Sequence, residues 1–167
     1  MTSTFHWSQY RSPVGTLYIL TQGDVVRGLN LSGFPDLVSS LYSEEHSSQI
    51  KKSAKISWLN SILDDYFDGD LKAINTIKVE QPGGDFSQSA WKSMRKIRAG
   101  RVASYAELAD MAGSSAAVRA AGSACAKNKI AIIIPCHRIV KTGGAIGNYG
   151  WGVNIKAELL RHEGVEY

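Results

Sequence analysis

Several features that are common in other classes of protein are missing from this 167-residue sequence. No apolar run approaches the roughly 20 residues that a membrane-spanning helix needs, and residues 1–12 lack the basic segment and apolar stretch of a signal peptide. The two cysteines, Cys125 and Cys136, form no C-x-x-C pair and lack zinc-ligand spacing. We therefore expect a cytoplasmic protein with reduced thiols that binds no membrane, metal or cofactor.

A phosphate-binding loop is also absent. The segment 141–152 has five glycines in twelve positions but does not match G-x-x-x-x-G-K-[ST]. Such glycine density indicates tight turns or a close approach of the backbone to a ligand. Tyr149 and Trp151 within the segment argue against a merely flexible hairpin.

Charge is distributed unevenly along the chain. Residues 1–85 contain 7 Lys or Arg and 10 Asp or Glu, whereas residues 86–167 contain 12 and 5. A basic half beside an acidic half suggests that one part of the protein meets a polyanion. Solvated charge that is unevenly spread by chance explains these counts equally well.

Residues 1–80 are typical of a small α/β domain. Three short segments rich in apolar and aromatic residues predict an antiparallel meander, over residues 4–11, 16–20 and 25–31. An amphipathic helix capped by Ser53 and ending near Gly69 is expected next, and residues 74–80 predict a further strand. The segment 81–85, QPGGD, is the best candidate for a linker.

Residues 86–167 indicate a mostly helical domain. Asp85 and Gln88 resemble a capping box for its first helix, and Ser104 and Glu107 form a clearer one for the next. A glycine turn then leads into an alanine-rich helix over roughly 116–127, the outline of a helix-turn-helix. That outline is weak evidence on its own. Asn154 is expected to cap a last helix, which ends at Gly164.

One group of residues has the chemistry of an activated thiol. Cys136 lies in the stretch IIIPCHRIV before His137 and Arg138, and Glu163 follows later. Nearby cations or an imidazole favour the reactive thiolate, and a carboxylate can orient the imidazole. Adjacent residues do not face each other on a regular element, so we expect His137 to act through a water or a sharp turn at Pro135. From spacing alone, an inert buried cysteine remains the commoner alternative.

A series of motifs in the same order resembles one protein family. Residues 86–164 are similar to the O6-alkylguanine-DNA alkyltransferases, also called methylated-DNA–protein-cysteine methyltransferases. The matching motifs are Phe86-x-x-x-x-Trp91, Ser104-Tyr105-x-x-Leu108-Ala109, Arg119-Ala120-x-Gly122, Asn128, the run Ile133 to Val140 around Pro135-Cys136-His137-Arg138, Gly147 to Gly152, and His162-Glu163-Gly164. The resemblance implies a ribonuclease-H-like α/β domain, with an antiparallel sheet plus helices, in residues 1–80. It implies a DNA-binding and catalytic domain in residues 86–167.

The resemblance also implies a reaction and its residues. Cys136 would take the alkyl group from O6 of guanine, and from O4-alkylthymine, as a stable thioether, so that each molecule reacts once. His137 would act as base through a water while Glu163 holds the imidazole, and Tyr105 would donate toward the departing guanine. Arg138 is expected to hold the local fold.

Further residues are implied for binding. Those for the substrate are Asn128, Ile139 (through its carbonyl), Tyr149, Gly150 and Lys156; those for DNA are Ser104, Arg119, Ala120 and Gly122. A stacked guanine cannot reach a buried thiol, so the nucleotide must be flipped out of the duplex from the minor groove, and Arg119 would fill the gap. We expect a monomer that binds duplex DNA, with cooperative assembly on DNA left open.

The sequence departs from the family at a few positions. Arg98 stands where many members have proline. Lys129-Ile130-Ala131 lacks the proline that commonly follows the asparagine, which suggests a pocket wall that is either roomier or more mobile. Cys125 is expected to be a small buried side chain.

Three alternatives differ in function. A lesion-binding relative without activity would lack Cys136. A thiol hydrolase would turn over. A transcription factor built on residues 104–127 would leave Cys136 unexplained.

Overall fold

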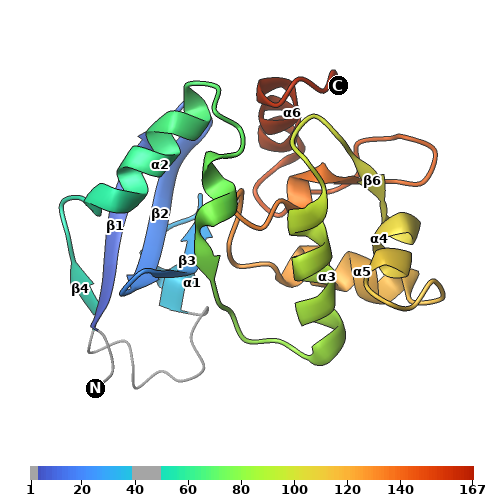
Figure 1. Cartoon of the computed structure of the whole chain (residues 1–167), viewed down its shortest axis with the longest axis horizontal. Helices are drawn as coiled ribbons and strands as arrows, with labels where there is room; N and C mark the ends of the chain where they lie inside the picture. Colours follow the sequence, from blue (N-terminus) through green and yellow to red (C-terminus); the bar gives the residue numbers. More distant parts are fainter. Residues whose placement is uncertain (1–3, 39–49) are drawn as a thin grey trace. The chain divides into compact units, whose positions relative to one another are not determined.

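The computed structural model describes residues 4–38 and 50–167 (Figure 1). The chain divides into two compact units between Pro82 and Gly83, inside the segment that the sequence predicts as a linker. Within the described ranges, no helix combines the length and apolar character that crossing a membrane requires.

The first unit contains a five-stranded mixed sheet. The strands, in the order β4-β1-β2-β3-β5, are β4 (Ile50–Lys52), β1 (Phe5–Ser12), β2 (Gly15–Gln22), β3 (Val25–Asn30) and β5 (Lys78–Val79). The central three form the predicted antiparallel meander. The prediction of a purely antiparallel sheet is wrong at both edges, because β4 pairs with β1 and β5 with β3 in parallel. Parallel neighbours need long crossover connections, and the helices of this unit lie in those connections.

The helices of the first unit are α1 (Phe34–Val38), α2 (Ser57–Phe67) and the 3₁₀ turn η2 (Ala73–Thr76). The predicted stripe of α2 is present, since Leu59, Leu63 and Tyr66 are buried. Ser53 does not cap this helix: its N–H donates to the carbonyl of Trp7 at 2.8 Å and extends the β1–β4 pairing, and α2 begins only at Ser57. The strand predicted over 74–80 is shortened to β5 because η2 occupies its first residues.

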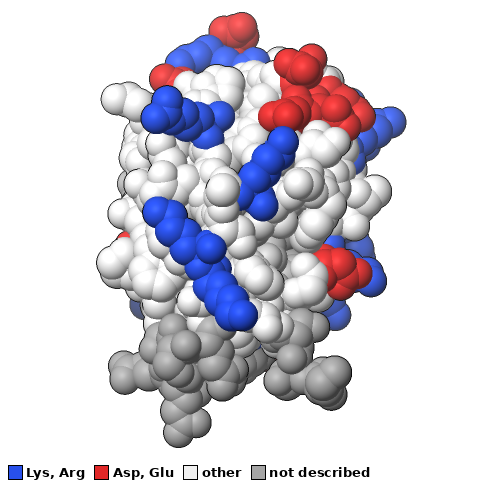
Figure 2. Space-filling view, turned by 90° about the vertical axis from the view of Figure 1, so that its left-hand side faces the viewer, with Lys and Arg blue, Asp and Glu red and all other residues white. Residues whose placement is uncertain are grey.

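One face of the first unit has a mixed charge distribution. Figure 2 shows Lys and Arg side chains in separate groups with uncharged surface between them, and Asp and Glu side chains gathered mainly toward one end. Long-range attraction of a polyanion is strongest where like charges adjoin. The described residues on this face therefore do not form a continuous basic surface.

The second unit is mostly helical. Its elements are α3 (Asp85–Lys96), β6 (Ala103–Ser104), α4 (Tyr105–Met111), α5 (Val118–Lys127), the 3₁₀ turn η3 (Cys136–Arg138), β7 (Ile139–Val140) and α6 (Val153–His162). The two short strands β6 and β7 pair in parallel, and α5 packs against both α3 and α4. The alanine-rich helix thus begins at Val118, two residues later than predicted.

Helix caps in this unit agree with the sequence at one place and differ at two. Ser104 and Glu107 form the predicted capping box of α4, with bonds of 3.0 and 3.1 Å. The box predicted for Asp85 is wrong, because α3 starts one residue earlier and Gly84 is its N-cap. Asn154 is likewise not the cap of α6, whose N-cap is Gly152 in a backbone conformation with φ 110°.

An indole connects α3 to α5. Trp91 is buried and donates from Nε1 to the carbonyl of Ala124 at 2.9 Å. Gly83 lies against the same ring, since an added Cβ there would come within 2.5 Å of it. These contacts fix α5, the helix that leads into the Cys136 segment.

Candidate active site

The segment between α5 and Cys136 is folded tightly by its own backbone. Ile132 has φ 71°, and Ile133 N–H donates to the carbonyl of Ala131 at 2.7 Å, a γ-turn of the rare left-handed kind. Pro135, with φ −83° and ψ 64°, forms an inverse γ-turn in which Cys136 N–H donates to Ile134 at 2.8 Å. A left-handed residue with a side chain costs about 1–2 kcal/mol. Full burial of the isoleucine side chain, worth about 1.5–3 kcal/mol, offsets that cost.

The side chain of Asn128 joins this segment to the end of α5. Its Nδ2 donates to the carbonyls of Ile130 and Ile134 at 3.3 and 2.9 Å, and its Oδ1 accepts from Ile130 N–H at 3.1 Å. The same Nδ2 lies 3.3 Å from Sγ of Cys136. One amide therefore sets the position of both turns and of the thiol.

Cys136 is 5% exposed and begins η3. Burial raises the pKa of its thiol, while the bond from Asn128 and the positive charge of Lys156 oppose that rise. Such groups stabilise a thiolate more than the apolar run alone would.

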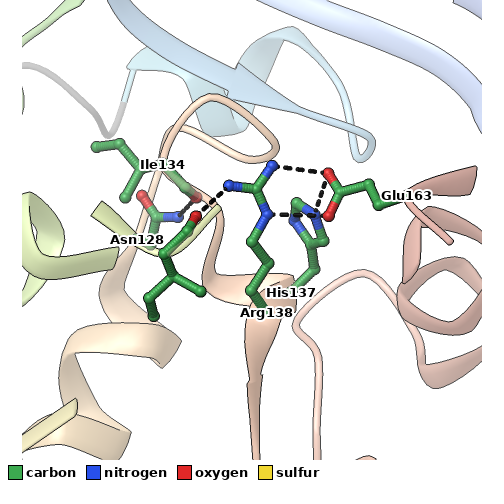
Figure 3. A network of polar contacts seen from close by, with 6 residues as sticks. Asn128, Ile134, His137, Arg138 and Glu163 are labelled. Carbon is green, nitrogen blue, oxygen red and sulfur yellow. Dashed lines mark hydrogen bonds and ion pairs between the residues drawn. The ribbon is translucent and has the colours of Figure 1, made fainter. Parts of the chain in front are cut away.

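Behind the thiol lies a buried network of charged groups, drawn in Figure 3. Glu163 accepts from Arg138 Nε and Nη2, both at 2.9 Å, and its Oε2 lies 3.0 Å from Nε2 of His137. The remaining Nη1 of Arg138 donates to the carbonyl of Ile97 at 2.7 Å. The bidentate pair ties η3 to the end of α6.

Protonation within the network follows from its geometry. Burial raises the pKa of Glu163, but the charge of Arg138 and the hydrogen bonds from Arg138 and His137 outweigh it, so the pKa is lowered overall. Burial lowers the pKa of His137 despite the neighbouring carboxylate, which favours a neutral imidazole. Since Nε2 faces a carboxylate, the proton of that imidazole sits on Nε2. Nδ1 is buried without a hydrogen-bond partner among the described residues and is left as an acceptor.

Lys156 is a second buried cation. Its Nζ donates to the carbonyls of Ile139 and Asn148 at 2.6 and 3.1 Å. Burial lowers the pKa of this amine overall, and the negative charge that Cys136 and Cys125 carry as thiolates opposes that shift. Lys156 thus holds the segment after Cys136 to the glycine-rich loop.

Cys136 opens into a pocket of about 820 Å³. Residues of α4, α5 and the glycine-rich loop form its walls: Tyr105, Val118, Arg119, Gly122, Ser123, Cys125, Ala126, Lys141, Thr142, Asn148, Tyr149 and Gly150. This volume lies within the range of about 300–1,000 Å³ that small-ligand sites occupy.

Comparisons with known proteins agree on one family. The family described as "6-O-methylguanine DNA methyltransferase, DNA binding domain" matches residues 85–165. A methylated-DNA–protein-cysteine methyltransferase of Mycobacterium bovis is 33% identical over 158 residues, which cover 95% of this chain and 92% of that protein. The chain belongs to the methylated-DNA–protein-cysteine methyltransferase family.

One further relative is similar to this chain in sequence, and one solved structure is similar to it in fold. The protein of Kluyveromyces lactis with that name is 39% identical over 128 residues, covering 74% of this chain and 67% of that protein. The crystal structure of Mycobacterium tuberculosis OGT in complex with DNA has a TM-score of 0.79 at 33% identity and covers 95% of this chain and 92% of that one. The mixed sheet and helices of this methyltransferase are thus similar to those of solved relatives.

The predicted site residues fall into three groups in this methyltransferase. The residues that line the pocket are Tyr105, Arg119, Gly122, Cys136, Tyr149 and Gly150. Those buried without lining it are Asn128, His137, Ile139, Lys156 and Glu163. The prediction that Ile139 and Lys156 contribute to substrate binding stays a prediction: the Lys156 amine donates to the Ile139 carbonyl, and neither residue lines the pocket. Ser104 and Ala120 do not line the pocket, and Ser104 caps α4.

Sequence reasoning missed several residues of the pocket wall. Val118 and Cys125 share helical spacing with the predicted Gly122, and the three present one face of α5 to the pocket. That spacing was visible in the sequence. Lys129, Ile130 and Ala131 are not among the residues that line the pocket, whereas Cys125 is.

Proposed function

We propose that this chain repairs alkylated DNA by moving the alkyl group from O6 of guanine to Sγ of Cys136. The observation that carries the proposal is the thiol itself, which lies at a pocket and is contacted by the amide of Asn128 at 3.3 Å. In one displacement the S–C bond forms and the C–O bond breaks, and guanine leaves with a proton. A thioether resists hydrolysis because a thiolate is a poor leaving group from an alkyl carbon, so each molecule reacts once.

The proton movements follow from the network. Neutral His137 accepts the thiol proton on Nδ1 through a bridging water, since Nε2 is occupied by Glu163. Burial and the nearby cysteine side chains raise the pKa of Tyr105. This phenol therefore stays protonated at neutral pH and can donate a hydrogen bond to the departing guanine. Lys156 and Asn128 act from behind the wall by holding the backbone that carries the thiol.

Recognition of the base belongs to the rest of the pocket. Tyr149 and Gly150 face it from the glycine-rich loop, and Tyr149 packs edge-on against Trp151 with ring centroids 5.2 Å apart. This packing steadies the loop on which a flipped guanine, or an O4-alkylthymine, would rest.

DNA is the partner that we propose for the second unit. The pair α4 and α5 serves as a helix-turn-helix that approaches the minor groove, with Arg119, exposed at the pocket edge, filling the gap left by the flipped nucleotide. Ala120 and Gly122 have small side chains, which allow the sugar-phosphate backbone to approach the helix closely. Ser104 contributes by capping α4.

The division of labour follows the two units. Residues 83–167 form the DNA-binding and catalytic domain, and residues 1–82 form a ribonuclease-H-like domain without a proposed catalytic role. We expect a cytoplasmic monomer that binds duplex DNA with little sequence preference and with affinity that falls steeply with salt, because phosphates dominate such contacts.

The test is a change of mass. Incubation with an oligonucleotide that contains O6-methylguanine should add one methyl group to the intact protein, and Cys136→Ala should add none. Cys125→Ala is the matched control, because it removes the other thiol of the pocket and should still be methylated. An unchanged mass would refute the proposal, and repair of more than one lesion per molecule would favour a thiol hydrolase.

A further inference from the structure

The backbone at Ile132 has a conformation that its residue type disfavours. Among the described residues it is the one non-glycine with positive φ, at 71°, and isoleucine is β-branched. Strained residues persist where the surroundings hold them, and they cluster at functional sites. Here the strain lies four residues before the reacting thiol.

Glycine would adopt this conformation without strain, yet the position carries a fully buried isoleucine. A glycine would also leave the segment free to adopt either sign of φ. The buried side chain removes that freedom, because leaving the left-handed region would pull the side chain from its packing. Isoleucine at position 132 therefore has a more strained backbone than glycine would have, but it restricts the segment to one conformation.

That single conformation determines where the thiol lies. The left-handed turn at Ile132 and the inverse turn at Pro135 fold the chain back twice between Ala131 and Cys136. Only such a compact path lets one Nδ2 of Asn128 reach the carbonyl of Ile134 at 2.9 Å and Sγ of Cys136 at 3.3 Å. If the first turn opens, the sulfur moves away from the amide that stabilises its charge.

We propose that Ile132 is a positioning residue for alkyl transfer: its buried side chain locks a left-handed turn that places Sγ of Cys136 against the amide of Asn128. The inference rests on the proposed function for its consequence in repair, but thiol reactivity tests it separately. Ile132 does not touch the substrate and acts through the backbone alone.

The experiment compares two glycine substitutions at neighbouring buried isoleucines. Ile132→Gly removes the anchor at a left-handed position, whereas Ile133→Gly makes the same chemical change at a residue that is 2% exposed and lacks positive φ. Rates of alkylation by iodoacetamide, a small neutral electrophile, are measured against pH under conditions where both variants are folded. A Cys125→Ala background makes Cys136 the sole thiol.

We expect Ile132→Gly to be the more stable of the two glycine variants but the less reactive. Ile132→Gly relieves strain and should unfold at higher denaturant concentration than Ile133→Gly, yet it should react roughly tenfold or more slowly near neutral pH, the effect of losing one hydrogen bond to a charged group. Its pH profile should move upward by about one pH unit. Ile132→Val keeps a buried β-branched anchor and should restore the rate to within about twofold of the parent, since only one methylene is lost.

Equal rates for Ile132→Gly and the parent, or an equal loss in Ile133→Gly, would overturn the positioning role. Methyl transfer to the parent protein is measured in parallel. A parent that reacts with iodoacetamide but takes no methyl group from O6-methylguanine would sink the proposed function while leaving the iodoacetamide comparison intact.

Discussion

The two units bury polar groups of different kinds. Among described residues, those buried in the first unit are Ser8, Thr21, Arg27, Asn30 and Gln81, while those in the second are Ser93, Asn128, His137, Arg138, Lys156 and Glu163. Only one of the first set carries a charge at neutral pH. The second set contains three charged groups and an imidazole, and two of those charged groups bond to each other.

The core of the first unit is therefore mainly apolar, whereas the core of the second unit also contains charged groups. The sheet of the first unit satisfies its backbone by strand pairing and fills its core with groups such as Leu17, Ile19 and Leu20, all fully buried. Buried charges are costly unless well paired, and replacing them by apolar groups often stabilises a protein. In the second unit the carboxylate of Glu163 is paired with Arg138 and His137, so the stability of this unit depends on keeping that network intact.

The largest effect is expected from breaking the charged network. Glu163→Gln leaves the guanidinium of Arg138 buried without its counter-ion and should lower the free energy of unfolding by about 3–5 kcal/mol. In the first unit, Asn30→Ala removes a neutral acceptor for two backbone N–H groups and should cost only about 1 kcal/mol. Denaturant unfolding measures both.

A double variant checks the cause. Glu163→Gln combined with Arg138→Met removes both charges and should recover part of the lost stability while leaving the site inactive. Equal costs for the single and the double variant would show that packing, and not an unpaired charge, explains the loss.

An intermediate effect is expected from pH. Because burial lowers the pKa of His137 in the folded protein, the unfolded chain binds a proton near pH 6.5 that the folded one resists. This contribution to stability is present above about pH 6.5 and is lost as the pH falls, with a slope of up to about 1.4 kcal/mol per pH unit. His137→Gln should weaken the dependence of the unfolding free energy on pH between pH 7.5 and 5.5, measured by denaturant unfolding at each pH. An unchanged slope would mean that this imidazole is charged in the folded state.

The smallest effect on stability should come from the exposed face of α5. Gly122 lies inside the helix, and an added Cβ would meet no atom within 4 Å, so packing does not require a glycine there. Gly122→Ala should stabilise the helix by roughly 1 kcal/mol yet slow repair of duplex DNA, because the methyl group obstructs the nucleic acid. Arg119→Ala should slow duplex repair with little change in stability.

Free O6-benzylguanine serves as the control substrate, since it needs no flipping. Both variants should react with it at nearly the parent rate, and Ser89→Ala, exposed on α3 and outside the pocket lining, should leave both reactions unchanged. Equal losses on duplex and free substrate would contradict a DNA-contacting role for this face.

Local signals explain which elements were predictable. The meander, the stripe of α2 and the capping box at Ser104 depend on residues close in sequence, and all three are present. Cap predictions were wrong where another interaction took the residue or another residue took the position. Ser53 pairs with β1, and Gly84 and Gly152 are the N-caps of α3 and α6 in place of Asp85 and Asn154. Periodicity does not reveal such competition.

The candidate site was predictable in composition but not in geometry. The motif around Cys136 indicated a thiol with an imidazole, and the pairing of Glu163 with His137 was expected from the family resemblance. The bidentate bond from Arg138 and the left-handed turn at Ile132 arise from tertiary packing, which leaves no sequence signature. Tertiary context also hid the bond between Lys156 and the Ile139 carbonyl.

The contact between Gly83 and Trp91 matters to anyone who wishes to dissect or fuse this protein. A side chain at position 83 would collide with the indole, and the indole holds α5 through Ala124. A truncated second unit should therefore keep glycine at position 83 and place any affinity tag or fusion partner before Pro82. A junction that changes this glycine would alter the pocket from a position well outside it in sequence.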